Sequence, residues 1–166
     1  LLPKNFGPNQ GYPVEILNMI YNASDVMLSS CMGEGWGLMA TEAMACKKPI
    51  IMPANTSMLE IVGEDRGFLV KSGNTLNNWA VHSNDNDVLR PLVDIEDMIE
   101  KMLYVHDNPE EAKKRAENGY RWVSSNLIWD KHIVPQWDKV LTKALEKSYS
   151  APPPPSAKTI ISGDEL

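Results

Sequence analysis

Apolar positions repeat at helical spacing in several stretches of this chain. After Pro13, which suits a first helical turn, the stretch YPVEILNMIYNASD places Ile16, Leu17, Ile20 and Tyr21 on one face, as expected of an amphipathic helix. Helical patterns and acidic first turns predict further helices in four stretches: LMATEAMAC, NTSMLEIVG, DIEDMIEKMLYVHD and NPEEAKKRAENGYRWVSSN.

Short apolar runs alternate with these helices and predict strands. The runs are VMLSS (26–30), KPIIMPA and GFLVK. Their apolar character is continuous rather than alternating, which is typical of strands buried on both faces of a parallel sheet covered by helices. The pattern therefore predicts an α/β fold, a Rossmann-like three-layer domain with a mostly parallel sheet, over residues 1–147.

The C-terminal part of the chain carries a longer helical pattern. One helix is expected over residues 129–147, with a kink near Pro135 because proline interrupts helical hydrogen bonding. Its apolar stripe consists of Trp129, Ile133, Trp137, Val140 and Leu141. Residues 148–166, which include APPPPSAK, are expected to form a Pro-rich tail with a polyproline II spacer.

Residues 72–92 are rich in Asn and Asp and show no sustained period, so we expect a long loop or insertion there. Trp79 lies in this segment. The sequence leaves two roles open for it, a contact with a partner or substrate and simple packing.

Composition and charge narrow the range of partners. The 166 residues are 43% hydrophobic, with a net charge of -6 and no Lys/Arg-dense stretch, which argues against a nucleic-acid surface. No apolar run reaches the roughly 20 residues of a membrane-spanning helix, and the N-terminus lacks the regions of a signal peptide. We therefore expect a cytoplasmic protein without a transmembrane segment, in which Cys31 and Cys46 stay reduced. The scattered histidines lack metal-ligand spacing.

The candidate chemistry lies in GEGWGLMATEAMA, residues 33–45. A predicted strand ends just before it, and Gly35 and Gly37 free the backbone of a loop that leads into a helix. Unpaired N–H groups and the helix dipole suit a diphosphate at this point, beyond the carboxyl end of a strand. Glu42, a turn or more into the helix, would lie near a ribose and accept from two adjacent hydroxyls. Glu34 would lie nearer to the group attached to the far phosphate.

Two plainer interpretations stay open on spacing alone. Glu42 could be a solvated carboxylate at the rim of the helix, since surface carboxylates are common. Gly35 and Gly37 could form an ordinary tight turn.

At these residues the sequence resembles a known family. EGWGLMATE followed by AMACKKPII is similar to the E-x7-E region of retaining glycosyltransferases of the GT-B fold, specifically the large group-4 family, called group 1 in older usage. YNASDVMLSS, SMLEIVGEDRGFLV and the C-terminal helical stretches resemble other segments of that family in the same order. The resemblance covers Tyr12 to Leu145 and corresponds to the C-terminal, donor-binding domain.

The resemblance implies a UDP- or GDP-sugar donor, with Glu42 on the ribose hydroxyls and loop N–H groups on the diphosphate and sugar. Glu34 would be the catalytic candidate, orienting sugar hydroxyls and stabilising charge that develops on the sugar ring. Transfer would proceed with retention and without a metal or other cofactor. The substrate-binding residues implied are Glu34, Gly35, Trp36, Gly37, Leu38 and Glu42.

The sequence departs from the family pattern in several places. Lys47 stands where the family usually has glycine, and Asn55-Thr56 replaces a Gly-Gly turn. The basic Arg and Lys that usually face the diphosphate lie upstream in the family, as does the acceptor-binding N-terminal domain, and neither has a counterpart here. Because the chain also lacks an initiator Met, we expect a piece of a longer polypeptide that binds donor without transferring sugar by itself. Its last helix, left partly exposed, is expected to favour self-association.

Two other functions stay open at this stage. One is a non-catalytic module that binds a nucleotide sugar, and the other is a nucleotide-sugar epimerase or hydrolase of GT-B architecture. The fold does not separate these from a transferase. The E-x7-E spacing favours the transferase, because an epimerase would need different acid/base residues.

Overall fold

The computed structural model describes residues 11–81 and 87–150, and the chain divides into two compact units, one ending at Asn126 and one beginning at Leu127. The sequence pattern predicted a later boundary, after residue 147. The helices of the first unit are α1 (Val14–Ala23), α2 (Leu38–Ala45), α3 (Met58–Val62), α4 (Ile95–Asp107) and α5 (Pro109–Asn126).

Three parallel strands form the central sheet of the first unit. They are β1 (Met27–Leu28), β2 (Ile50–Pro53) and β3 (Phe68–Val70), in the spatial order β1-β2-β3. Helix α2 connects β1 to β2, and α3 connects β2 to β3. Because the strands are parallel, their carboxyl ends meet at one edge of the sheet. The predicted α/β fold with a parallel sheet is confirmed, although the first strand is shorter than residues 26–30.

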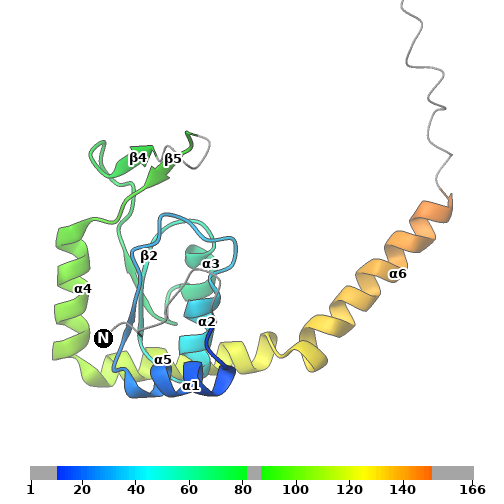
Figure 1. Cartoon of the computed structure of the whole chain (residues 1–166), viewed down its shortest axis with the longest axis horizontal. Helices are drawn as coiled ribbons and strands as arrows, with labels where there is room; N and C mark the ends of the chain where they lie inside the picture. Colours follow the sequence, from blue (N-terminus) through cyan, green and yellow to red (C-terminus); the bar gives the residue numbers. More distant parts are fainter. Residues whose placement is uncertain (1–10, 82–86, 151–166) are drawn as a thin grey trace, which may run out of the picture. The chain divides into compact units, whose positions relative to one another are not determined.

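Helices cover both faces of this sheet, and β2 shows it most clearly because all four of its residues are buried. Ile50 and Met52 belong to a core cluster with residues of α2 and α3. Ile51 belongs to a second cluster that includes Phe68 of β3 and Met98 of α4. Figure 1 shows α4 on one side of the sheet and α2 and α3 on the other. The continuous apolar run therefore marks a strand buried on both faces, as predicted.

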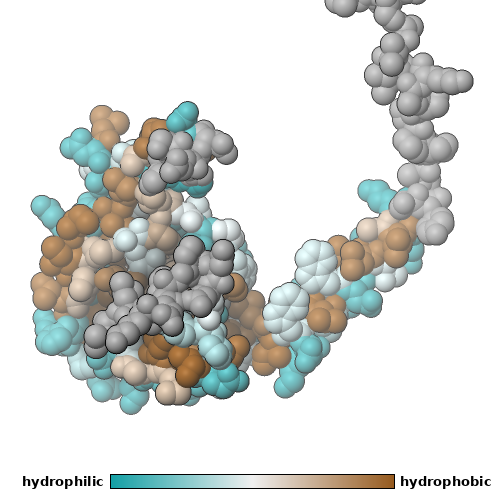
Figure 2. Space-filling model, viewed as in Figure 1, coloured by the Kyte–Doolittle hydropathy of each residue, from teal (hydrophilic) through white to brown (hydrophobic). Residues whose placement is uncertain are grey.

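The apolar residues of α4 lie mostly on its outer side. Met98 is buried, whereas four apolar residues at helical spacing with it are exposed, namely Ile95, Ile99, Met102 and Leu103. Figure 2 shows apolar residues along the edge of the first unit where α4 lies. The helix itself was predicted correctly, but only part of its stripe faces the core.

Residues 72–92, predicted to be a long loop or insertion, include an antiparallel hairpin. Strand β4 (Trp79–Val81) pairs with β5 (Leu89–Pro91), with Ala80 opposite Arg90. The hairpin was missed because three-residue strands are too short to show a period in the sequence. Its tip, residues 82–86, lies outside the described part of the chain, and so does His82.

The second unit contains the C-terminal helix, whose start differs from the prediction. A π-helix, η1 (Trp129–Ile133), precedes α6 (Val134–Ser150). Pro135 is thus the second residue of α6, in the first turn, where a missing N–H costs little. Helix α6 also extends three residues into the predicted tail, of which 151–166 lie outside the described residues. Among the described residues, no helix is long and apolar enough to cross a membrane.

Asp97 is a buried carboxylate, 5% exposed, at the start of α4. Its Oδ2 accepts a hydrogen bond of 2.8 Å from the backbone N–H of Lys71, at the end of β3. Its Oδ1 lies 3.4 Å from Nζ of Lys101 and 3.6 Å from Nζ of Lys71. Burial alone would raise the pKa of Asp97, but the Lys71 N–H and the charges of Lys101 and Lys71 hold this pKa below its usual value. This carboxylate therefore joins α4 to the sheet.

Asp97→Asn is expected to weaken the dependence of stability on pH. A carboxyl whose pKa is lower in the folded state stabilises the fold above its unfolded pKa of about 3.9. This contribution is lost as the pH falls through the folded pKa. Urea unfolding at several pH values should thus show a steeper acid loss below about pH 4 in the wild type than in Asp97→Asn. Glu96→Gln, which removes an exposed carboxylate from the same helix, is the control, and equal acid slopes in wild type and Asp97→Asn would contradict the assignment.

Candidate functional site

The loop after β1 leads directly into α2, and Gly37 is the N-cap residue of this helix. Gly37 has φ 86° and ψ 64°, in the left-handed region that favours glycine. A Cβ added there would overlap Cε of Met58 and would lie 3.8 Å from Cβ of Glu34. Helix α2 has no side-chain hydrogen bond at its N-cap, and the first N–H groups of a helix have no acceptor within it. Leu38, its first residue, is 67% exposed. The predicted diphosphate position is therefore an uncapped helix end beside Glu34.

Two hydroxyl side chains after β2 hold the backbone of this loop. The N–H of Glu34 donates to Oγ1 of Thr56 at 3.0 Å. Oγ of Ser57 lies within hydrogen-bonding distance of two carbonyl oxygens, that of Glu34 at 2.9 Å and that of Trp36 at 3.0 Å. Asn55, which is buried, donates to the carbonyl of Cys31 at 3.2 Å. The segment that replaces the family's Gly-Gly turn thus fixes the shape of the glycine loop.

Left-handed backbone occurs at two positions where the family usually has glycine. Lys47 has φ 55°, and the N–H groups of Lys47 and Lys48 donate to the carbonyls of Met44 and Ala43 at 2.9 Å each. These bonds form a Schellman motif that ends α2. In the Asn55-Thr56 pair the left-handed residue is Thr56, with φ 41°. The fold therefore keeps both turns without glycine.

Glu42 has a partner within the protein. The hydroxyl of Tyr21, on α1, donates to Oε2 of Glu42 at 2.8 Å. Burial, followed by the hydrogen bond to Glu42 and its charge, raises the pKa of the Tyr21 phenol, so this hydroxyl stays protonated. Both side chains are half-buried. The Tyr21 hydroxyl therefore satisfies one oxygen of the carboxylate that lies in this apolar helix, and it fixes the position of Oε2. No sequence signal identified Tyr21 as that donor, because it was assigned only to an apolar stripe.

The predicted site residues fall into two groups. Glu34, Gly35, Trp36, Gly37 and Leu38 follow one another around the N-terminus of α2, whereas Glu42 points to α1 through Tyr21. Trp36 is 38% exposed, and Gly35 has nothing within 4 Å of an added Cβ. The loop is therefore open to a ligand.

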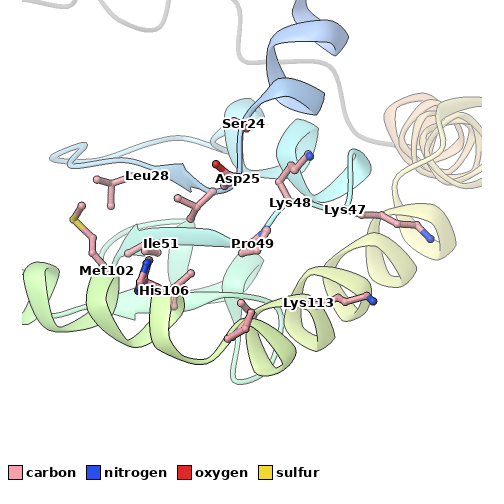
Figure 3. Close-up of a pocket in the computed structure, with 14 residues that line it drawn as sticks. Ser24, Asp25, Leu28, Lys47, Lys48, Pro49, Ile51, Met102, His106 and Lys113 are labelled. Carbon is pink, nitrogen blue, oxygen red and sulfur yellow. The ribbon is translucent and has the colours of Figure 1, made fainter.

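A cavity of about 500 Å³ lies elsewhere in the first unit. Its walls come from β1, β2 and α4, with Leu28, Ile51 and Met102 among the apolar lining and Lys48 and His106 near them. Figure 3 shows these side chains around the open space. None of the predicted site residues lines it. Asp25 and Lys113 also line this cavity, but it lies away from the strand-to-helix loop that matches the predicted donor site, so the glycine loop remains the candidate for the chemistry.

The two cysteines and Trp79, singled out in the sequence, show no sign of a functional role in the structure. Cys31 and Cys46 are both free. Trp79 packs against Gly73 and donates from Nε1 to its carbonyl at 3.0 Å, which favours the packing role. Within residues 11–81 and 87–150, no group of three His, Cys, Asp or Glu residues is placed to hold a metal ion.

Comparison with known proteins gives a family match in the N-terminal part of the chain. Residues 9–80 match the family described as "Glycosyl transferases group 1", a stretch that includes the glycine loop, Glu42 and all three parallel strands. The trehalose synthases of Thermococcus litoralis and Pyrococcus furiosus are each 32% identical over 118 residues, which is 70% of this chain and 23% of theirs. The chain thus spans less than a quarter of these curated relatives.

Solved structures share the fold. Sucrose-phosphate synthase from Thermosynechococcus elongatus aligns with a TM-score of 0.62 and 24% identity, over 80% of this chain and 28% of that one. HepE from Anabaena, solved in complex with UDP-glucose, aligns with a TM-score of 0.53 and 15% identity, over 77% of this chain and 29% of that one. The family match and the curated relatives place the chain among the group 1 glycosyltransferases, and the solved structures show that it has the GT-B type of fold.

Proposed function

We propose that this chain forms the donor-binding half of a retaining glycosyltransferase, which transfers a sugar from a UDP- or GDP-sugar to an acceptor. The observation that carries the proposal is the uncapped N-terminus of α2. It follows a glycine loop that is held by hydrogen bonds to Thr56 and Ser57, and Glu34 lies beside it. The family membership supports a sugar transfer, and the HepE structures with UDP and UDP-glucose support a nucleotide sugar as the ligand.

Each part of the site has a role in this proposal. The N–H groups around Trp36, Gly37 and Leu38 bind the diphosphate, because backbone donors and the helix dipole favour an anion there. Glu42 accepts hydrogen bonds from the ribose hydroxyls, mainly through Oε1, since Oε2 already accepts from Tyr21. Glu34 orients hydroxyls of the donor sugar and stabilises positive charge that develops on its ring.

We expect this site to use neither a metal nor another cofactor, because backbone N–H groups and the dipole of α2 stabilise the diphosphate. A non-catalytic nucleotide-sugar module would use the same contacts, so binding alone does not separate it from a transferase. An epimerase or hydrolase would leave free sugar or an epimer of the donor in an incubation without acceptor. Chromatography of such an incubation distinguishes these reactions.

Direct titration tests the proposal. Calorimetry of the wild-type chain with UDP, UDP-glucose, GDP and GDP-mannose, each with and without EDTA, should detect binding of at least one nucleotide at micromolar to millimolar concentration. The affinity should be the same in EDTA. If no nucleotide binds at millimolar concentration, the assignment of the glycine loop as a donor site is wrong.

A further inference from the structure

The β4–β5 hairpin brings an arginine to the glycine loop. Arg90 is the middle residue of β5, and its side chain reaches back to the loop that follows β1. A Cβ built on Gly33 would lie 3.2 Å from Nη1 of Arg90 and 3.4 Å from Cγ2 of Thr56. Figure 1 shows the hairpin at the end of the sheet where the β1–α2 loop lies. A guanidinium group therefore adjoins the loop proposed to bind the donor.

Strand pairing and backbone hydrogen bonds fix the part of the hairpin that carries Arg90. Arg90 is half-buried, and its backbone is in register with Ala80 of β4. The base of the hairpin is held at the sheet, because the N–H of Gly73 donates to the carbonyl of Leu92 at 3.0 Å and that of Asp94 donates to the carbonyl of Lys71 at 2.8 Å. Asn55, which supports the same loop, also donates to Oγ of Ser72 at 3.1 Å. The hairpin and the loop therefore share one set of contacts.

The charges around the glycine loop suggest what a guanidinium group could do there. The sequence contains no Lys or Arg between Lys4 and Lys47, and the loop itself carries Glu34. A diphosphate at the N-terminus of α2 would add negative charge beside that carboxylate, and a cation close by would offset it. The planar guanidinium of arginine suits phosphate oxygens because it donates two parallel hydrogen bonds.

We propose that Arg90 is a ligand of the donor's diphosphate, which makes strand β5 part of the donor site. This proposal rests on the proposed function above. Arg90 is a binding residue in this assignment: it steadies the diphosphate in the bound donor and stabilises it as the leaving group after sugar transfer. No proton moves at the guanidinium, because arginine stays charged in proteins.

The test compares a nucleoside diphosphate with its monophosphate. Calorimetry uses UDP against UMP, or GDP against GMP, according to which base the wild-type chain binds. Arg90→Gln should weaken diphosphate binding about 10-fold and monophosphate binding by clearly less, so that the preference for the diphosphate falls. Arg121→Gln, which removes the same charge from an exposed position on α5, should leave both affinities unchanged. Equal thermal midpoints of the wild type and the variant show that Arg90→Gln is folded.

The possible results separate the two proposals. If the wild type binds diphosphate and Arg90→Gln keeps both its affinity and its diphosphate preference, the role of Arg90 is wrong while the donor site stands. If the wild type binds no nucleotide, the proposed function is wrong and the role of Arg90 falls with it. If Arg90→Gln fails to fold, Arg90→Met keeps the length of the side chain, and its diphosphate preference decides in the same way.

Discussion

Replacing Glu42 by alanine is expected to weaken binding of the nucleotide sugar by about 1.5 to 3 kcal/mol, because charge-assisted hydrogen bonds to the ribose hydroxyls are lost. This corresponds to roughly a 10- to 150-fold higher Kd in calorimetry. The effect should depend on the ribose. The affinity of the wild type should fall by a similar factor when 2′,3′-dideoxy nucleotide replaces the ribonucleotide, and Glu42→Ala should lose no further affinity for the dideoxy analogue.

The partner of Glu42 provides a matched variant. Tyr21→Phe keeps the ring of α1 in place but removes the hydroxyl that donates to Oε2, so the carboxylate stays while its orientation is freed. A smaller loss of affinity is expected, about 0.5 to 1.5 kcal/mol, which is the net value of an ordinary hydrogen bond. If Glu42→Ala binds the nucleotide as tightly as the wild type, Glu42 serves only the contact between α1 and α2, and the ribose has another partner.

The α/β fold was predictable because its strands appear in the sequence as short unbroken apolar runs, which can be recognised without knowing the tertiary structure. An unbroken run such as KPIIMPA fits a strand covered on both faces, and β2 is buried at every position. The hairpin gave no such signal, since three-residue strands pair through backbone bonds that sequence does not display. The exposed stripe of α4 was uninformative for a related reason. The helical spacing of apolar residues predicts a helix, but it does not show how much of the apolar face is buried in the core.

The site was predictable only in part. Glycine spacing after a strand identified the loop, because φ 86° at Gly37 is a backbone requirement that glycine meets. The side chains that complete the loop come from elsewhere in the chain. Ser57 and Arg90 reach the loop, and Tyr21 reaches Glu42, only when the turn after β2, the hairpin and α1 are assembled. Such long-range contacts follow from the tertiary fold, and no local pattern in the sequence marks them.

Gly37→Ala is expected to destabilise the first unit by about 2 to 5 kcal/mol. An L-residue in the left-handed region costs about 1 to 2 kcal/mol, and the new methyl group overlaps Cε of Met58, a fully buried side chain whose displacement adds about 1 to 3 kcal/mol. The thermal midpoint should therefore fall by roughly 5 to 15 °C. Gly35→Ala is the control from the same loop. Its φ is not positive, and nothing lies within 4 Å of the added Cβ, so its midpoint should stay close to that of the wild type. Equal midpoints for the wild type, Gly37→Ala and Gly35→Ala would show that the loop accommodates a side chain at residue 37 without loss of stability. The backbone donors at the start of α2 would then not be held ready for a diphosphate.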